Sequence, residues 1–216
     1  VFSNYQAGVF PAGCNNLRIS DSIFRGNGYG VDSTGATGLE ISDCTFEDNL
    51  LGVQLFAGSA GSVQHCTFQT SHIWGEGIVA TMGSTVEVLN TEILPGGAWG
   101  IKADNHSLVV GSGNTIAAGS ESVIDLLNAD MTLSDSHILS DGGLTVNCRH
   151  LIDDTWTIDL RNNWWGVADA ATIGDMIHDG KDAPDIPAIV LFEPFADGEV
   201  PNESMSWGSL KKLYRQ

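Results

Sequence analysis

The sequence predicts an all-β fold: a parallel β-helix of about seven coils of 22–27 residues, closed by a short C-terminal cap helix and strand. Three observations predict it. One apolar position recurs at a nearly constant interval, short segments alternate between apolar and polar residues, and turn-forming residues separate these segments. The 26 glycines and the charged fraction of 17% are also typical of a turn-rich β protein.

The recurring apolar position defines the repeat. It is occupied by Phe2, Phe24, Phe46, Phe68, Ile93, Ile116, Ile138 and Trp165, at steps of 22, 22, 22, 25, 23, 22 and 27 residues. Two residues earlier stands a small or polar residue: Ser22, Cys44, Cys66, Thr91, Asn114, Ser136 or Asn163. Units of this length cannot bury an apolar face alone, so they stack, and equivalent residues form ladders with a spacing of about 4.8 Å.

Two further strands recur in each repeat. One alternates strictly, at 17–19, 39–41, 86–88, 108–110, 131–133 and 158–160. The other begins at a small residue, at 30–31, 52–53, 77–78, 100–101, 122–123 and 143–144. Each coil therefore holds three short strands, each with one buried face.

Cys44 and Cys66 are separated by one repeat, so we expect them to be stacked neighbours that point into the interior. Parallel Cβ vectors fit disulfide geometry poorly, and a buried free cysteine behaves as a small hydrophobic residue. We interpret both as core residues, with a disulfide as the alternative. The four cysteines show no metal-ligand spacing.

Residues 1–167 form the coils, the first of them incomplete, and 168–195 form the cap. Asp169 is the expected N-cap of the cap helix and Gly180 its expected end, with a strand at 186–195. Residues 196–216 form a linker and a terminal amphipathic segment. Its apolar residues are candidates for assembly with another chain or for docking on the rod: Trp207, Leu210, Leu213 and Tyr214.

The stretch RNNWWGVADAATIGDMIHDG, the downstream EPF and the ISDSIF and ISDCTF coils resemble the right-handed parallel β-helix repeat family over roughly residues 1–195. The resemblance implies a right-handed coil and an extracellular or cell-surface protein of bacterial type. It implies no single activity, since the fold serves carbohydrate lyases, epimerases and adhesins.

The charge balance excludes some partners. With 27 acidic and nine basic residues, the net charge is −18, which repels nucleic acid and anionic membranes. The longest apolar run, AIVLF, is too short to span a bilayer, so we expect no membrane insertion.

Catalytic chemistry in this fold would lie on an outward row of a sheet. The row after the small residues reads Asp32, Gln54, Val79, Lys102, then Asp125 or Ile124, then Thr145. Lys102 could act as a base beside Asp104 and Asp125, as in polysaccharide lyases. However, stacked aspartates for a bridging Ca²⁺ are missing and positive charge is scarce, so a scattered solvated face is the favoured alternative. A third outward row reads Ile23, Thr45, Thr67, Glu92, Thr115, His137 and Trp164.

Two other kinds of site are candidates. Tyr29, Trp74 and Trp99 could stack on sugar rings, or simply cover coil turns. Three cap aspartates could hold a surface Ca²⁺: Asp179, Asp182 and Asp185. No other cofactor is expected.

Three hypotheses of function follow. The first is a non-catalytic extracellular or cell-surface structural or adhesive protein that self-associates, or binds another surface protein, through its open coil end or its tail. The second is a carbohydrate-binding module, and the third a polysaccharide lyase or hydrolase. Convergence of Lys102, Asp104 and Asp125 in a groove would favour the third.

Overall fold

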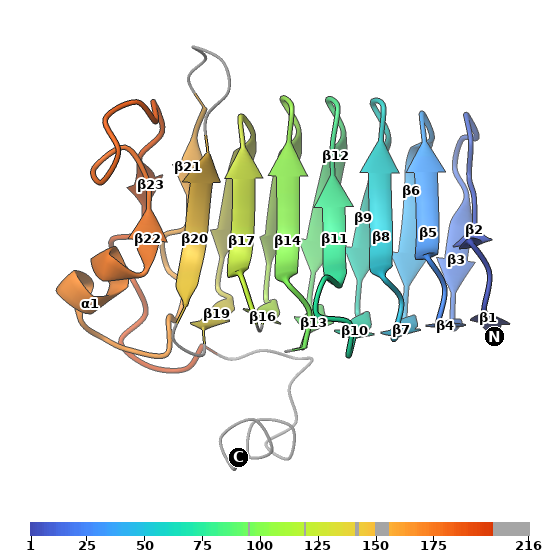
Figure 1. Ribbon diagram of the computed structural model, residues 1–216, viewed down its shortest axis with the longest axis horizontal. Coiled ribbons are helices and arrows are strands. Elements are labelled where there is room, and N and C mark those ends of the chain that lie inside the picture. The colour runs from blue at the N-terminus through green and yellow to red at the C-terminus, as the bar shows by residue number, and fades with distance from the viewer. Residues whose placement is uncertain (95, 119, 141–142, 150–155, 201–216) are drawn as a thin grey trace.

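The computed structural model describes residues 1–94, 96–118, 120–140, 143–149 and 156–200. Within these residues the strands form three parallel sheets, and successive coils follow one another along a rod from β1 to the cap (Figure 1). The predicted parallel β-helix is therefore confirmed.

The three sheets take one strand each from successive coils. Sheet A contains β1 (Phe2–Ser3), β4 (Ile23–Arg25), β7 (Thr45–Glu47), β10 (Thr67–Gln69), β13 (Glu92–Ile93), β16 (Thr115–Ala118) and β19 (His137–Ser140). Sheet B contains β2 (Ala7–Val9), β5 (Tyr29–Thr34), β8 (Leu51–Phe56), β11 (Glu76–Ala80), β14 (Trp99–Asp104), β17 (Ser122–Leu127), β20 (Leu144–Arg149) and β22 (Ile177–His178). Sheet C contains β3 (Arg18–Ser20), β6 (Thr37–Ser42), β9 (Ala60–Gln64), β12 (Thr85–Leu89), β15 (Leu108–Ser112), β18 (Asp130–Ser134), β21 (Ile158–Asp159) and β23 (Val190–Leu191).

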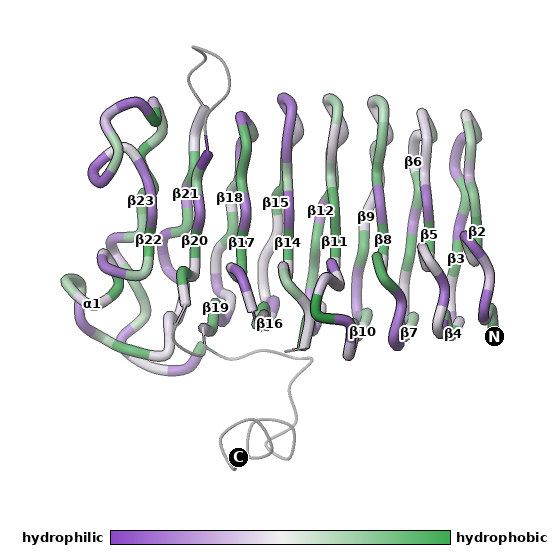
Figure 2. The backbone as a smooth tube through the Cα atoms, in the orientation of Figure 1, coloured by the Kyte–Doolittle hydropathy of each residue, from purple (hydrophilic) through white to green (hydrophobic). Residues whose placement is uncertain are grey.

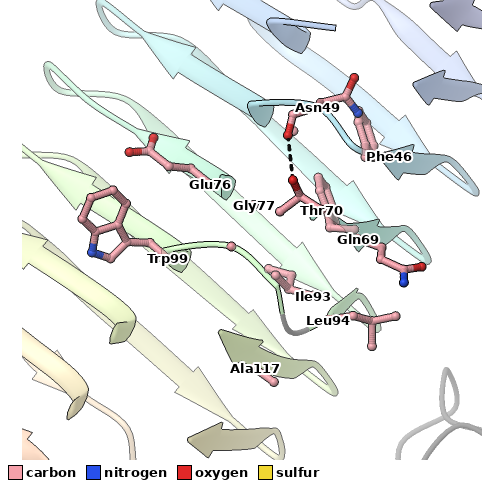
Figure 3. Close-up of a pocket in the computed structure, with 13 residues that line it drawn as sticks. Phe46, Asn49, Gln69, Thr70, Glu76, Gly77, Ile93, Leu94, Trp99 and Ala117 are labelled. Carbon is pink, nitrogen blue, oxygen red and sulfur yellow. Dashed lines mark hydrogen bonds between the residues drawn. The ribbon is translucent and has the colours of Figure 1, made fainter. Parts of the chain in front are cut away.

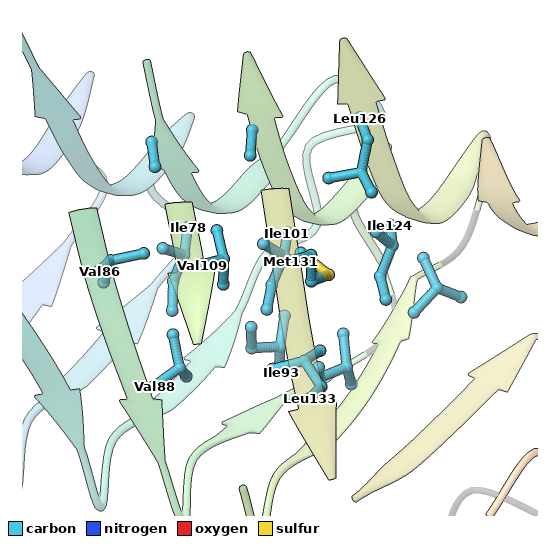
Figure 4. Packing of buried hydrophobic residues seen from close by; sticks show 14 of the residues in the cluster. Ile78, Val86, Val88, Ile93, Ile101, Val109, Ile124, Leu126, Met131 and Leu133 are labelled. Carbon is cyan, nitrogen blue, oxygen red and sulfur yellow. The ribbon is translucent and has the colours of Figure 1, made fainter. Parts of the chain in front are cut away.

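The predicted apolar ladder runs through the core along sheet A. Phe2, Phe24, Phe46 and Phe68 are in register and stack at 5.0, 4.9 and 4.5 Å between ring centroids. Sheets B and C complete the core: Figure 4 shows Ile78, Val86, Ile101, Val109, Ile124 and Met131 between them. Hydrophobic and hydrophilic residues alternate along the strands, as Figure 2 shows, because the two faces of each strand meet core and solvent.

Glycines of sheet B make room for the phenylalanine stack. A Cβ on Gly52 would lie 2.5 Å from Cδ1 of Phe68 and 2.6 Å from the carbonyl oxygen of Gly77. Gly30 meets Phe46 in the same way. The glycine at the second position of β5 and of β8 is thus required by the packing of the phenylalanine that it faces.

The corner between sheets C and A explains the ladder of small polar residues. The residue before each member has a positive φ, as at Asp43 with 54°. The thiol of Cys44 then donates to the carbonyl of Ser42 at 3.1 Å, just as Ser22 donates to Ser20 at 2.9 Å. Cys44 and Cys66 are buried and free, which confirms the prediction.

A second polar ladder, at the corner between sheets A and B, was not predicted. The side-chain amide of Asn27 donates to Oδ1 of Asn49 at 2.9 Å and to the carbonyl of Phe2 at 3.0 Å. Asn49 in turn donates to Phe24 at 2.9 Å. Each asparagine satisfies backbone groups that the turn leaves unpaired.

Two details of register differ from the prediction. Val86 pairs with Val109, so Val109 faces the core, one residue from the position expected in segment 108–110. Likewise Ile101 pairs with Ile124, one residue beyond the expected alignment with 122–123. Both coil steps are one residue longer than the regular repeat, and a one-residue slip exchanges the two faces of a strand.

The cap continues the sheets. Asp169 caps α1 (Ala170–Asp175) by accepting from the amide of Thr172 at 2.8 Å, as predicted. The helix ends well before Gly180, because β22 already pairs with β20. The predicted strand 186–195 is reduced to β23, which pairs with β21. No helix in the described ranges is long and apolar enough to cross a membrane.

Candidate functional site

The outward face of sheet B carries a row of charged residues on neighbouring strands. Lys102 of β14 pairs in register with Asp125 of β17, and Asp125 pairs with Asn147 of β20. The sequence predicted Thr145 in place of Asn147, which is wrong, because the displaced register turns Thr145 into the interior. A parallel sheet places such residues side by side at about 4.8 Å per strand.

Lys102 is engaged by two residues of its own face. Its Nζ lies 3.1 Å from Oε1 of Glu76 and 4.6 Å from the ring centroid of Trp99. The ammonium group thus has both a carboxylate and the face of an aromatic ring as partners.

Asp125 is buried, with 2% of its side chain exposed, and is fully engaged. Its Oδ1 accepts from Nε of Arg149 at 3.0 Å and from the amide of Asn147 at 3.0 Å, while its Oδ2 accepts from the second guanidinium donor. A bidentate pair of this kind fixes both side chains. Asp125 thereby positions Arg149 and Asn147 at the surface.

Asp104 belongs to a different group. It accepts from the hydroxyl of Thr81 and from the amide of Asn105 at 3.0 Å. Among the described residues, no hydrogen bond or ion pair joins Lys102, Asp104 and Asp125 to one another. The three predicted catalytic residues share a face, and each has its own partners.

Beside this row lies a hollow that one small residue creates. Trp99, Ser122 and Leu144 hold equivalent positions on β14, β17 and β20. Because serine stands between two large residues, it leaves a space about 10 Å wide between their Cα atoms. The space, called here the sheet B hollow, has a volume of about 240 Å³ and is lined by Trp99, Glu121, Ser122, Asp125, Leu144, Asn147 and Arg149.

The lining combines an aromatic wall with polar groups. Trp99 and Leu144 form apolar walls, and Asn147 and Arg149 present donors. Ser122 lies between these two walls, and its hydroxyl is buried. Such a site suits a small ring with one apolar face and several hydroxyl groups.

The three predicted carbohydrate-binding aromatics are placed differently. Trp99 lines the hollow, whereas Tyr29 lies three strands away in the same row, at roughly 14 Å. Trp74 is exposed in the corner loop 70–75, whose Gly75 carbonyl accepts from the amide of Trp99 at 3.3 Å. The structure brings Trp74 and Trp99 together at one corner.

Figure 3 shows Glu76 and Trp99 at the starts of β11 and β14. It also shows the hydroxyl of Thr70, which donates a hydrogen bond to the carbonyl of Asn49 at 3.1 Å. The cavity that these residues line has a volume of about 20 Å³, enough for about one water molecule. This small cavity does not compete with the sheet B hollow as a ligand site.

Two of the three cap aspartates accept hydrogen bonds from backbone amides of the cap. The carboxylate of Asp179 is buried and accepts from the amides of Lys181 and Val190, both at 2.8 Å. Asp182 accepts from the amide of Asp179 at 3.3 Å. Across the described ranges, no group of three or more His, Cys, Asp or Glu side chains could hold a metal ion. Asp179 shapes the turn of the cap, and Ca²⁺ binding with Asp185 as a further ligand stays a prediction.

Three members of the predicted outward row of sheet A are buried. Glu92, Thr115 and His137 are covered, and Glu199 and Val200 lie beside His137. Burial raises the pKa of Glu92 and lowers the pKa of His137. The segment that follows the cap thus changes the surroundings of this face. The repeat pattern of the sequence does not predict where that segment lies. The predicted assembly residues Trp207, Leu210, Leu213 and Tyr214 lie outside the described residues.

Sequence reasoning missed several residues of the hollow: Glu121, Ser122, Leu144, Asn147 and Arg149. A signal for one of them was present, since Asn147 follows Asp125 by one regular repeat. Ser122 could have been found as the small residue between two large ones, but only with the register displacement known.

Comparisons with known proteins agree with this architecture. A family model described as "Right handed beta helix region" matches residues 1–163. Neither the curated proteins nor the solved structures include a match to the chain.

Proposed function

We propose a non-catalytic adhesive role for this chain, which belongs to the right-handed β-helix family. In this role the protein is extracellular or on a cell surface and binds a glycan in the sheet B hollow. The observation that carries the proposal is the sheet B hollow itself, in which the indole of Trp99 forms one wall and the polar side chains of Asn147 and Arg149 line the space beside it. A sugar ring could stack on the indole and hydrogen-bond to these polar side chains at the same time.

Binding without cleavage is the better fit to the charged row. A lyase needs a free base, and Lys102 is bonded to Glu76. A hydrolase needs two available carboxyl groups, and Asp125 is committed to Arg149 and Asn147. The row therefore supports a fixed binding surface.

The charges favour an uncharged glycan. Lys102 and Arg149 are each paired with a carboxylate, and Glu121 adds a further negative charge at the rim of the hollow. The whole chain carries −18, so a polyuronate would be repelled. A neutral polysaccharide needs no unpaired cationic side chain and is not repelled by the negative net charge.

The test is calorimetric titration with a panel of neutral and uronic-acid oligosaccharides. The protein should bind a neutral oligosaccharide, and Trp99→Ala should lower its affinity about tenfold or more. Tyr5→Ala is the matched control, because Tyr5 is an exposed aromatic at the same corner of the first coil. The control should bind like the unaltered protein.

Two outcomes would contradict the proposal. Absence of binding across the panel, or unchanged affinity of the Trp99→Ala protein, would reject glycan binding in the hollow. New reducing ends or unsaturated products from a bound oligosaccharide would reject the non-catalytic role. Self-association and binding to another surface protein stay predictions, which light scattering across a concentration series would test.

A further inference from the structure

We infer that the corner loop 70–75 forms a second subsite beside the sheet B hollow, with Trp74 as its platform, and that the ligand is a chain of several sugar residues. This inference rests on the proposed function and specifies its ligand. It follows from the origin of the loop, its anchoring and the side chains that it exposes.

The loop is an insertion into an otherwise regular corner. Between β7 and β8 the chain turns with residues 48–50, whereas between β10 and β11 it uses residues 70–75. Phe68 and Ile93 nevertheless pair in register, so the extra residues of this longer step project from the corner. Neither the core nor the sheets require them.

The backbone of the loop is fixed at both ends and at its centre. At its start, the hydroxyl and the amide of Ser71 donate to Oδ1 of Asp48 at 2.8 and 3.0 Å. At its centre, Ser120 donates to the carbonyl of Ile73 at 3.2 Å. At its end, the carbonyl of Gly75 accepts from the amide of Ala98 at 2.8 Å. A loop held in this way keeps its exposed side chains in place.

Two glycines of the next coil let the backbone of the loop pack directly against the backbone of that coil. A Cβ on Gly97 would lie 2.4 Å from the carbonyl oxygen of Gly75, and one on Gly96 would lie 2.0 Å from that of Thr70. These approaches are possible only with glycine, because real Cβ atoms do not come so close to a backbone oxygen. The two glycines let the loop cross directly over the corner toward the hollow.

The anchored loop exposes two large apolar side chains. Ile73 is 66% exposed and Trp74 60% exposed. Ordering a ligand-binding side chain costs free energy on association, and a fixed backbone reduces that cost. A tryptophan on a fixed loop is therefore a prepared contact surface for the apolar face of a ring.

The loop is continuous with the hollow. Its Gly75 contacts the amide of Trp99, one wall of the hollow, and its Ile73 is bonded to Ser120, the neighbour of the lining residue Glu121. Besides His72, no residue of the loop is ionisable, so a further uncharged sugar of the same chain is the occupant that fits.

The experiment measures affinity against ligand length. A neutral glycan that binds the protein is supplied as a series from one to six sugars, and the unaltered, Trp74→Ala, Ser120→Ala and Tyr5→Ala proteins are titrated calorimetrically. The Tyr5→Ala control removes an aromatic side chain with the same 60% exposure from the first coil. Equal melting temperatures show that the variants are folded.

Affinity of the unaltered and Tyr5→Ala proteins should rise with length. Trp74→Ala should leave the affinity for the shortest ligand unchanged and lower that for the longest about five- to tenfold. Ser120→Ala removes the hydrogen bond to the loop and keeps the tryptophan, so it should lower the affinity for the longest ligand about two- to threefold.

An unchanged length dependence in Trp74→Ala would overturn the second subsite. An equal loss at every length would also overturn it, because Trp74 would then act on the hollow itself. If Trp99→Ala still lowers the affinity for the glycan, the proposed function survives either result. If no member of the series binds, the proposed function fails and the inference fails with it.

Discussion

The coils before Phe68 and the coils after it follow one architecture with different regularity. In the first region every step is the same, the apolar ladder is phenylalanine, and Asn27 and Asn49 form a ladder at one corner. Beyond Phe68 the steps vary in length, the ladder changes to isoleucine, and Thr70 ends the asparagine pairing. The sheet B hollow and the loop 70–75 both lie in this second region.

The comparison teaches where a solenoid can hold a ligand. In a regular ladder each residue packs on its equivalent and each polar group is satisfied by the next coil, so little remains for a partner. A ligand site needs an interruption. Ser122 between Trp99 and Leu144 is one interruption, and the insertion after Gln69 is another. We therefore expect substitutions in the first region to change stability, and substitutions in the second to change binding.

The largest effect is expected in the regular region, at Gly52. In Gly52→Ala the new Cβ would meet Phe68 at 2.5 Å and the Gly77 carbonyl at 2.6 Å, and neither can move without disturbing a ladder. Overpacking of this kind should lower the free energy of unfolding by about 3 kcal/mol, measured by urea denaturation. Glycan affinity of the folded protein should not change.

Gly174→Ala is the control for this substitution. A Cβ at Gly174 would have no atom within 4 Å, and the residue lies in α1, so alanine should be neutral or stabilise by about 0.5–1 kcal/mol. A Gly52→Ala protein as stable as the original would contradict the packing role of the glycines.

A smaller effect is expected at Cys66. The thiol donates to the carbonyl of Gln64 at 3.3 Å, the same role that Ser136 fills toward Ser134 at 2.8 Å. Cys66→Ser should therefore cost about 1 kcal/mol or less in urea denaturation, since only the burial of the larger sulfur is lost. Thiol titration of denatured, unreduced protein should find all four cysteines free, and recovery of fewer than two thiols would contradict the assignment of Cys44 and Cys66 as core residues.

The smallest effect concerns pH and the inserted loop. The hydroxyl and then the amide of Ser71 donate to Asp48 and lower the pKa of that carboxyl below its ordinary value. The anchor is therefore fully present above the ordinary pKa of aspartate and is lost as the pH falls through the lowered value. Relative to its intrinsic exchange rate, the amide of Ser71 should lose protection over that acidic range while the core amides stay protected.

Asp48→Asn keeps an acceptor at this position and removes the titration. Its Ser71 amide should exchange with a flat dependence on acidity, once the intrinsic rate is divided out. The same acid-induced step in Asp48→Asn as in the unaltered protein would show that another group controls the loop.

The sequence predicted the architecture because a solenoid repeats its contacts at a fixed spacing. Phe24, Phe46 and Phe68 recur once in each regular repeat and indeed stack, and Asp169 caps its helix as expected. The cap helix and the cap strand were both predicted too long, because β22 pairs with β20 where the helix was expected to continue, and only β23 of the expected strand pairs with β21.

The candidate site was predicted only in part. Trp99 and Trp74 were identified by residue type, but their proximity depends on Gly75 and Ser120, which belong to different coils. Lys102, Asp104 and Asp125 were grouped by spacing, yet Glu76 and Arg149 take two of them as partners. Spacing tells which residues share a face, whereas the choice of partner depends on side-chain reach and on register slips of one residue.

The pairing of each strand with the next coil also determines how the rod responds to tension. The hydrogen bonds between coils run along the rod, so a pull along its axis puts the same force on every interface, and the weakest interface yields first. An interface with few pairs yields early, and β1 and β4 share only the pairs Phe2↔Phe24 and Ser3↔Arg25. Each released coil would add about 75 Å of extended chain, so the rod would lengthen in steps and dissipate work while the remaining coils stay folded.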